Sequence, residues 1–141
     1  MRKQINNLVE FNEAFGIEFP KSPLLIDAKT QELRVNLLLE ELEEYRVANT
    51  KGDITEVLDA IGDMLYIVLG TAVQHGMQNI LEDAFSIIHS SNMSKLDENK
   101  KPIINGDQHY DPRRPLGKVL KSDLYWSPTK KLDQLIIKER L

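Results

Sequence analysis

Residues 31–76 read QELRVNLLLEELEEYRVANTKGDITEVLDAIGDMLYIVLGTAVQHG. Apolar residues recur at helical spacing on both sides of the Lys-Gly-Asp sequence at residues 51–53, and that short polar sequence favours a turn. The stretch therefore predicts two long antiparallel helices, over residues 31–48 and 54–74.

Cap residues support these two helices. Asp53 is a good N-cap for the second helix, and Gly76 is suited to end it. Either Asp27 or Thr30 can cap the first. Shorter helices are expected over residues 3–15, 79–91 and 128–138.

The chain is therefore expected to be all-α, a four-to-five-helix bundle with an irregular basic C-terminal segment. Its 141 residues match one domain. Within residues 1–141, the helical core is expected over residues 1–91 and a loop-rich segment over residues 92–141, where Pro and Gly interrupt regular structure.

Composition and charge narrow the class of protein. The absence of cysteine fits a reducing cytoplasm. The longest apolar run, residues 61–73, contains Asp63 and is too short to span a membrane, and the polar N-terminus lacks the apolar core of a secretory signal. The net charge of -4 disfavours general nucleic-acid binding. Acidic residues dominate residues 1–90 and basic residues dominate 91–141, which suits metal and phosphate chemistry but also fits ordinary charge scatter.

Three glutamates of the first long helix lie on its apolar side. At about 100° per residue, Glu41 and Glu44 fall within about 100° of Glu40. Leu33 and Leu37 fall within the same sector, so these acids extend the apolar stripe. A solvated acidic face would instead lie opposite the leucines.

The second long helix is apolar around most of its circumference, which is typical of a buried helix. Its acids Glu56, Asp59 and Asp63 share one stripe about 60° wide. Burying ionised carboxylates is costly unless each finds a cation, a partner or a proton. This helix also needs more apolar cover than one chain readily supplies, so a homodimer or homotetramer is expected.

Folding the two helices antiparallel brings the acidic stripes together, with Glu44 level with Glu56 and Glu41 level with Asp59. Carboxylates this close repel one another unless divalent cations neutralise them, and oxygen-only ligation favours Mg²⁺ or Mn²⁺. Asp63 falls one turn deeper, where it would contact the ligand or support the site. The helical core is thus also the expected metal-binding core.

Plainer interpretations of these acids remain open. Glu56 follows Asp53 by three residues, which is the spacing of a capping box. The glutamates at residues 40–44, near Arg46, also fit a solvated helix face, and Glu43 fits that description best.

Several sequence motifs resemble a known family. The pattern EELEE at residues 40–44, followed by EVLD at residues 56–59, resembles the EExxE and ExxD signature of the MazG-like all-α NTP pyrophosphatases. The stretch VLDAIGDMLY at residues 57–66, with SNMSK at 91–95 and GKVLK at 117–121, is similar to the branch related to phosphoribosyl-ATP pyrophosphohydrolase. The resemblance covers roughly residues 5–130. It departs at Asn12, where related proteins often have His.

The resemblance implies a helical dimer or dimer of dimers that binds Mg²⁺ between two helices. It also implies hydrolysis of a (deoxy)nucleoside triphosphate to monophosphate and pyrophosphate, which suits nucleotide-pool house-cleaning. In this interpretation Glu40 orients or deprotonates the attacking water. The metal ligands are Glu41, Glu44, Glu56 and Asp59. The substrate contacts are Asp63, Asn92, Lys95, Lys118 and Lys121.

Other interpretations are possible. The lysines also fit solvated loop charges, and Phe11, Phe15 and Tyr66 fit either a helical core or the sides of a base. A di-iron bundle would need Glu-x-x-His pairs, which the three histidines do not supply. Hydrolysis of phosphoribosyl-ATP and a non-catalytic nucleotide sensor with the same metal cluster both remain open.

Overall fold

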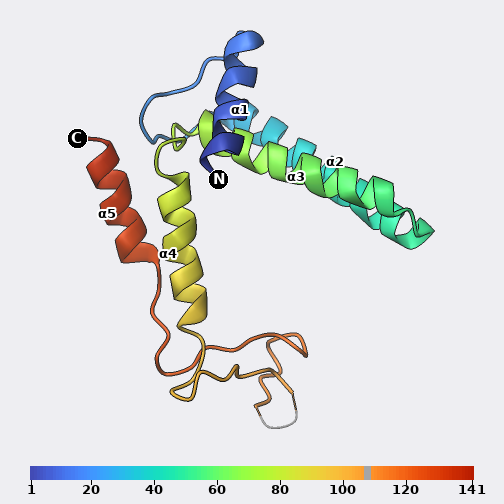
Figure 1. Cartoon of the computed structure of the whole chain (residues 1–141), viewed down its shortest axis with the longest axis vertical. Helices are drawn as coiled ribbons and strands as arrows, with labels where there is room; N and C mark the ends of the chain where they lie inside the picture. The colour runs from blue at the N-terminus through green and yellow to red at the C-terminus, as the bar shows by residue number, and fades with distance from the viewer. Residues whose placement is uncertain (107–108) are drawn as a thin grey trace. The chain divides into compact units, whose positions relative to one another are not determined.

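The computed structural model describes residues 1–106 and 109–141, and that part of the chain forms five α-helices (Figure 1). Their bounds are α1 Arg2–Ala14, α2 Ala28–Lys51, α3 Ile54–Gln74, α4 Leu81–Met93 and α5 Thr129–Glu139. The described residues contain no strand, only an isolated antiparallel bridge between Ile104 and Val119. The all-α prediction is confirmed, and every helix bound lies within three residues of its predicted position.

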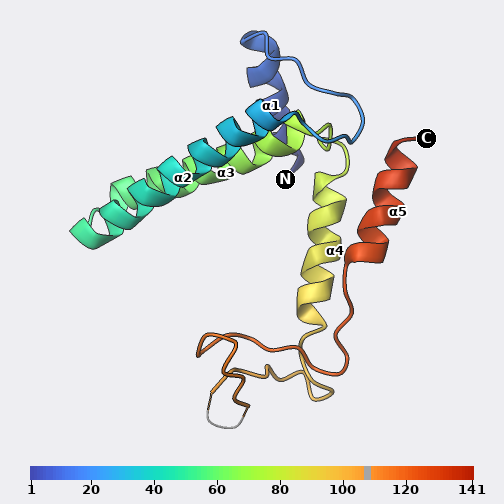
Figure 2. The same cartoon turned by 180° about the vertical axis from the view of Figure 1, so that it is seen from behind.

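The α2–α3 hairpin forms as its sequence predicts. The Asp27 side chain caps α2 by accepting a hydrogen bond from the Thr30 backbone N–H at 3.0 Å, so Asp27 is the capping residue of the two candidates. Gly52 ends α2 in the left-handed conformation with φ 73°, which glycine adopts without steric cost. Asp53 then caps α3 through the backbone N–H groups of Thr55 and Glu56. The two helices lie side by side in both views (Figures 1 and 2).

The chain divides into two compact units, and the first comprises residues 1–81 with Arg140. In this unit α1 packs against α3. Its buried core joins Ile5 and Leu8 of α1 to Leu69 and Val73 of α3. The core therefore lies near the C-terminal end of α3.

Toward the turn, the hairpin has no cover from the rest of the first unit. Leu58 is 71 % exposed and Leu65 is 53 % exposed, although both lie on the helix that is apolar nearly all round. Leu39 and Leu42 on α2 are exposed as well. The burial expected from the sequence is therefore not achieved within the first unit.

The second unit comprises residues 82–139 with Leu141, and contains α4, α5 and the loops between them. Ser91 on α4 donates a hydrogen bond to the Trp126 carbonyl at 2.9 Å, which ties the helix to the segment before α5. Asn105 is 1 % exposed. Its amide nitrogen donates to three carbonyls of the loop and its amide oxygen accepts from the Asp111 N–H at 2.7 Å. One buried side chain thus fixes the start of the basic loop.

Among the described residues, no helix combines the length and the apolar character needed to cross a membrane.

Candidate functional site

The predicted acidic residues lie along facing parts of the α2–α3 hairpin. The pKa of Glu41 is raised above its usual value, first by burial of the carboxyl and then by the negative charges of neighbouring acids. The charges that act on it, in decreasing order, belong to Glu44, Asp63, Glu40 and Asp59. Acids from both predicted stripes are therefore near enough to Glu41 for their charges to act on it.

Glu41 stands out within this acidic group. Its side chain is half-buried, and its Oε2 atom is shielded from solvent without a hydrogen-bond partner in the described part of the chain. A shielded carboxylate oxygen among like charges is unfavourable unless a cation compensates it. The chemistry of the donor set, all carboxylate, fits a hard divalent ion.

The other acids are exposed, contrary to the burial expected from the sequence. Across residues 1–106 and 109–141, no three His, Asp or Glu side chains are placed so that together they could hold a metal ion. The fold thus brings acids near Glu41. In the described residues, however, their side chains do not point to one common position where a metal ion could bind. The leucines that were expected to shield the acids are exposed as well.

Glu44 and Glu56 line one hollow of about 430 Å³ beside the hairpin turn, as their predicted alignment requires. The capping-box alternative for Glu56 does not apply. In a capping box the Glu side chain accepts from the N-cap backbone N–H, but the Asp53 N–H already donates to the Ala48 carbonyl at 3.0 Å. The Glu56 carboxylate is therefore not used as a cap.

Glu43 belongs to the solvated face of α2, as its angular position predicts. It accepts a hydrogen bond from Arg46 Nε at 2.8 Å, and this contact lowers the pKa of the Glu43 carboxyl. Glu43 and Glu41 are thus two glutamates of one helix with opposite electrostatic surroundings.

The predicted lysines of the second unit lie together. Lys95, Lys118 and Lys121 line one open groove of about 460 Å³, which Arg114 and Asp111 also line. Lys95 Nζ donates to Asn92 Oδ1 at 2.6 Å, so Asn92 orients this lysine. The groove concentrates positive charge, which is what binding of phosphate groups requires.

A comparison with protein-family models matches residues 8–92 to phosphoribosyl-ATP pyrophosphohydrolase (PRA-PH). The chain belongs to the PRA-PH family. The resemblance to the MazG-like all-α pyrophosphatases is thereby confirmed. A search of curated proteins found no match.

The PRA-PH match includes the whole α2–α3 hairpin and the six acids predicted to form the site. Pyrophosphohydrolases of the PRA-PH family are generally dependent on divalent metal, which agrees with the all-carboxylate donor set. The match ends at residue 92, so the three lysines of the groove lie beyond it.

Two features of the site were missed in the sequence. Arg34 is a lone cation on the otherwise apolar side of α2, seven residues before Glu41, and that position could have drawn attention to it. Asn105 offers no comparable signal, because the carbonyls that it binds come together only in the folded loop.

Proposed function

We propose that this chain is a divalent-metal-dependent hydrolase that converts a (deoxy)nucleoside triphosphate to the monophosphate and pyrophosphate. The observation that supports this most directly is the shielded, unpartnered Oε2 of Glu41 among four other carboxylates. Membership of the PRA-PH family supports the class of reaction.

Glu41, Glu44, Glu56 and Asp59 would hold Mg²⁺, with Mn²⁺ as a substitute. When bound, the ion neutralises phosphate charge and makes a water more acidic. Glu40 accepts the proton of the attacking water. The water oxygen forms a bond to the α-phosphorus, the bond from that phosphorus to the bridging oxygen breaks, and pyrophosphate leaves with the electron pair.

Asp63 has a positioning role in this proposal, since its charge acts on Glu41 more strongly than that of Asp59. In the second unit, Lys95, Lys118 and Lys121 would neutralise phosphate charge, and Asn92 would hold Lys95 in place. These lysines are a separate part of the proposal from the metal site.

The exposed apolar face of the hairpin supports a homodimer or a dimer of dimers. Covering Leu58, Leu65 and the neighbouring leucines of α2 would shield the acids and restore the burial that the sequence calls for. A second copy offers the same face, and two copies can cover each other symmetrically.

Product analysis of purified protein tests the reaction. A panel of NTPs and dNTPs is incubated with Mg²⁺, Mn²⁺ or chelator, beside a Glu41→Gln, Asp59→Asn double variant. We expect monophosphate and pyrophosphate from the native protein with metal only. Release of orthophosphate instead would assign cleavage to another bond and contradict the proposal.

Phosphoribosyl-ATP is the second candidate substrate, because the matched family carries that name. Including it in the panel separates the two: turnover of phosphoribosyl-ATP alone would favour it. Metal-dependent nucleotide binding without turnover of any substrate would favour a sensor.

A further inference from the structure

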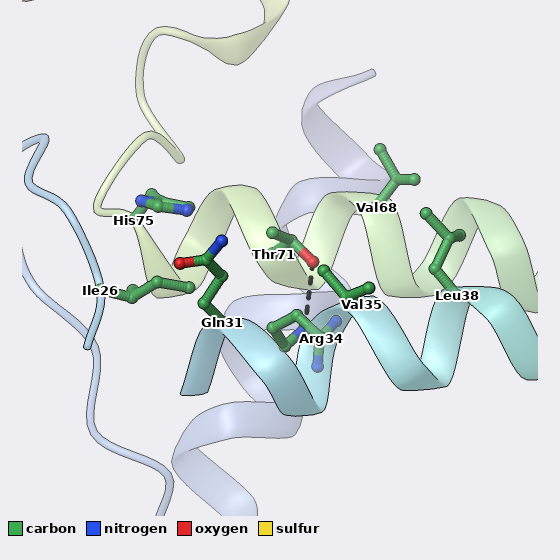
Figure 3. Close-up of a pocket in the computed structure, with 8 residues that line it drawn as sticks. All are labelled: Ile26, Gln31, Arg34, Val35, Leu38, Val68, Thr71 and His75. Atoms are coloured by element: carbon green, nitrogen blue, oxygen red, sulfur yellow. Dashed lines mark hydrogen bonds between the residues drawn. The ribbon is translucent and has the colours of Figure 1, made fainter. Parts of the chain in front are cut away.

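Arg34 places a positive charge in a half-buried position beside α3, with only neutral hydrogen-bond acceptors. Its Nε donates to Thr71 Oγ1 at 3.0 Å (Figure 3). Its Nη2 donates to the Ile67 carbonyl at 2.6 Å, so α3 fixes the guanidinium at two points. The side chain is half-buried, and burial lowers the Arg34 pKa. Both acceptors are neutral, and no described carboxylate forms an ion pair with this residue.

A half-buried guanidinium without a counter-charge is only partly compensated, because it has lost some of its hydration and gained two neutral acceptors. Arg34 Nη1 has no hydrogen-bond partner among the described residues. The arrangement therefore has a free donor, held in a fixed direction by the other two hydrogen bonds. Such a donor suits an oxygen acceptor on a bound ligand.

Arg34 lines a cavity of about 500 Å³ between α1, α2 and α3, which is open to solvent on one side. Its walls are mostly apolar, and they include Phe11 and Tyr66, whose rings meet edge to face with centroids 5.7 Å apart. The polar groups are few. This size and lining are typical of a small-molecule pocket that takes a flat ring.

The cavity continues the acidic stripe along the hairpin. Tyr66 follows Asp63 by three residues on α3, and Leu37 precedes Glu40 by three residues on α2, so each lies one helical turn from an acid on the same side. A ligand with phosphates near the acids would thus place its next portion toward this cavity.

A second polar group in the cavity is fixed by an amide pair. Asn12 is 4 % exposed and donates from Nδ2 to the Leu8 carbonyl at 2.6 Å. Its Oδ1 accepts from Gln74 Nε2 at 2.9 Å, which sets the orientation of the Gln74 amide. Gln74 lines the cavity, and within the described chain its Oε1 accepts no hydrogen bond. The cavity therefore offers one oriented acceptor in addition to the Arg34 donor.

We propose that this cavity binds the base of the nucleotide, and that Arg34 and Gln74 select bases with a ring carbonyl next to a ring N–H. This inference rests on the proposed function and names the substrate class of the same site. Arg34 donates to the carbonyl, and Gln74 accepts from the N–H. Guanine, hypoxanthine, uracil and thymine carry this pair of groups. Adenine and cytosine present an amino group beside a bare ring nitrogen, so both cavity groups would be left unpaired.

Gly70 provides a way to displace Arg34 without removing it. A Cβ added at Gly70 would lie 2.9 Å from Arg34 Nη2 and 3.5 Å from Leu8 Cδ1. The closer atom is the end of a flexible side chain, so a methyl group moves the guanidinium and leaves the helix intact. Gly62, on the same helix, would meet nothing within 4 Å. Gly70→Ala and Gly62→Ala are therefore a matched pair with the same gain in helix propensity.

The test measures binding without turnover. Affinities are determined by calorimetry in Mg²⁺ for α,β-imido triphosphates of guanine, uracil, adenine and cytosine, in which the scissile bond cannot be hydrolysed. The native protein and Gly62→Ala should bind the guanine and uracil analogues roughly 10- to 100-fold more tightly than the other two, the range of one good side chain–base pair. Gly70→Ala and Arg34→Met should lose that preference, with helicity by circular dichroism confirming the fold.

Equal affinity of the native protein for all four analogues would overturn the inference, and so would a preference that persists in both Gly70→Ala and Arg34→Met. The proposed reaction is judged separately. Base-selective binding without release of pyrophosphate from any NTP would refute the reaction and leave the base pocket standing. Turnover of NTPs without any preference among bases would support the reaction and refute the base pocket.

Discussion

Replacing Glu41 by Gln should make the metal-free protein more stable and the metal-loaded protein less stable. In the native chain the Glu41 carboxylate lies close to Glu44, Asp63, Glu40 and Asp59, and its Oε2 has no donor in the described residues. A neutral amide of nearly the same shape removes four repulsions. The side chain keeps part of its hydration, so the expected gain is about 0.5–1 kcal/mol, as for other partly solvated charges. This corresponds to a rise in Tm of about 1–4 °C.

With metal bound, the native protein should be more stable than Glu41→Gln. An ion that binds only the folded state adds about 2.7 kcal/mol at a hundredfold excess over its Kd, which is larger than the gain from removing repulsion. Glu41→Gln should lose most of this increment. The assay is thermal unfolding at fixed protein concentration in chelator and in a Mg²⁺ series. Glu43→Gln is the control, because Glu43 is paired with Arg46 and should respond to Mg²⁺ as the native protein does.

The effect in chelator should depend on pH. Because the folded-state pKa of Glu41 lies above its usual value of 4.5, the neutral carboxyl is favoured by folding. Native stability from this group is fully present below pH 4.5 and is lost as the pH rises through the folded-state pKa. The advantage of Glu41→Gln should therefore be absent near pH 4 and complete at pH 7. A variant that is less stable than native protein in chelator at pH 7, or that keeps the full Mg²⁺ response, would refute the reasoning.

Four further outcomes are expected. Asp53→Ala should lower the free energy of unfolding by about 1 kcal/mol in urea titration, since α3 loses its N-cap. Asn12→Ala should cost about 1–3 kcal/mol in the same assay, because the Gln74 amide loses its partner and the Leu8 carbonyl loses an additional side-chain hydrogen bond. Leu65→Glu should shift the mass measured by light scattering to that of one chain, and an unchanged oligomer would count against the hairpin face as the interface. Asn105→Ala should speed amide exchange at Asp111, whose N–H donates to the Asn105 side chain.

Local chemistry explains why so much of the hairpin was predictable. Apolar periodicity, the Gly52 turn and the Asp53 cap all act within a few residues, and each has the predicted effect. The neighbourhood of the acids was predictable for the same reason, because the antiparallel pairing follows from the short turn. Their exposure was not, because burial depends on what covers the hairpin, and the rest of the first unit does not cover Leu58 or Leu65.

The cavity and the basic loop depend on contacts between distant parts of the sequence. Arg34 is fixed by α3 residues 33 and 37 positions away, and Gln74 meets Asn12 across 62 positions. Asn12 was noticed only as a departure from a family pattern, whereas its structural role lies in orienting Gln74. Loop residues such as Asn105 are determined by backbone carbonyls, which side-chain patterns do not reveal.

The α3 helix, apolar nearly all round yet carrying three acids on one stripe, leaves few positions that can vary freely. A solvent-exposed helix tolerates drift on its outer face, but almost every residue of α3 packs, carries charge or belongs to the exposed apolar face that a second copy would cover. Random substitution along Ile54–Gln74 should therefore show a nearly flat profile of damage rather than the usual peaks every three to four residues. A saturation library can be scored both for protein abundance and for turnover. Only at the acids should the two scores differ, because neutral replacements there should leave the protein abundant and abolish turnover.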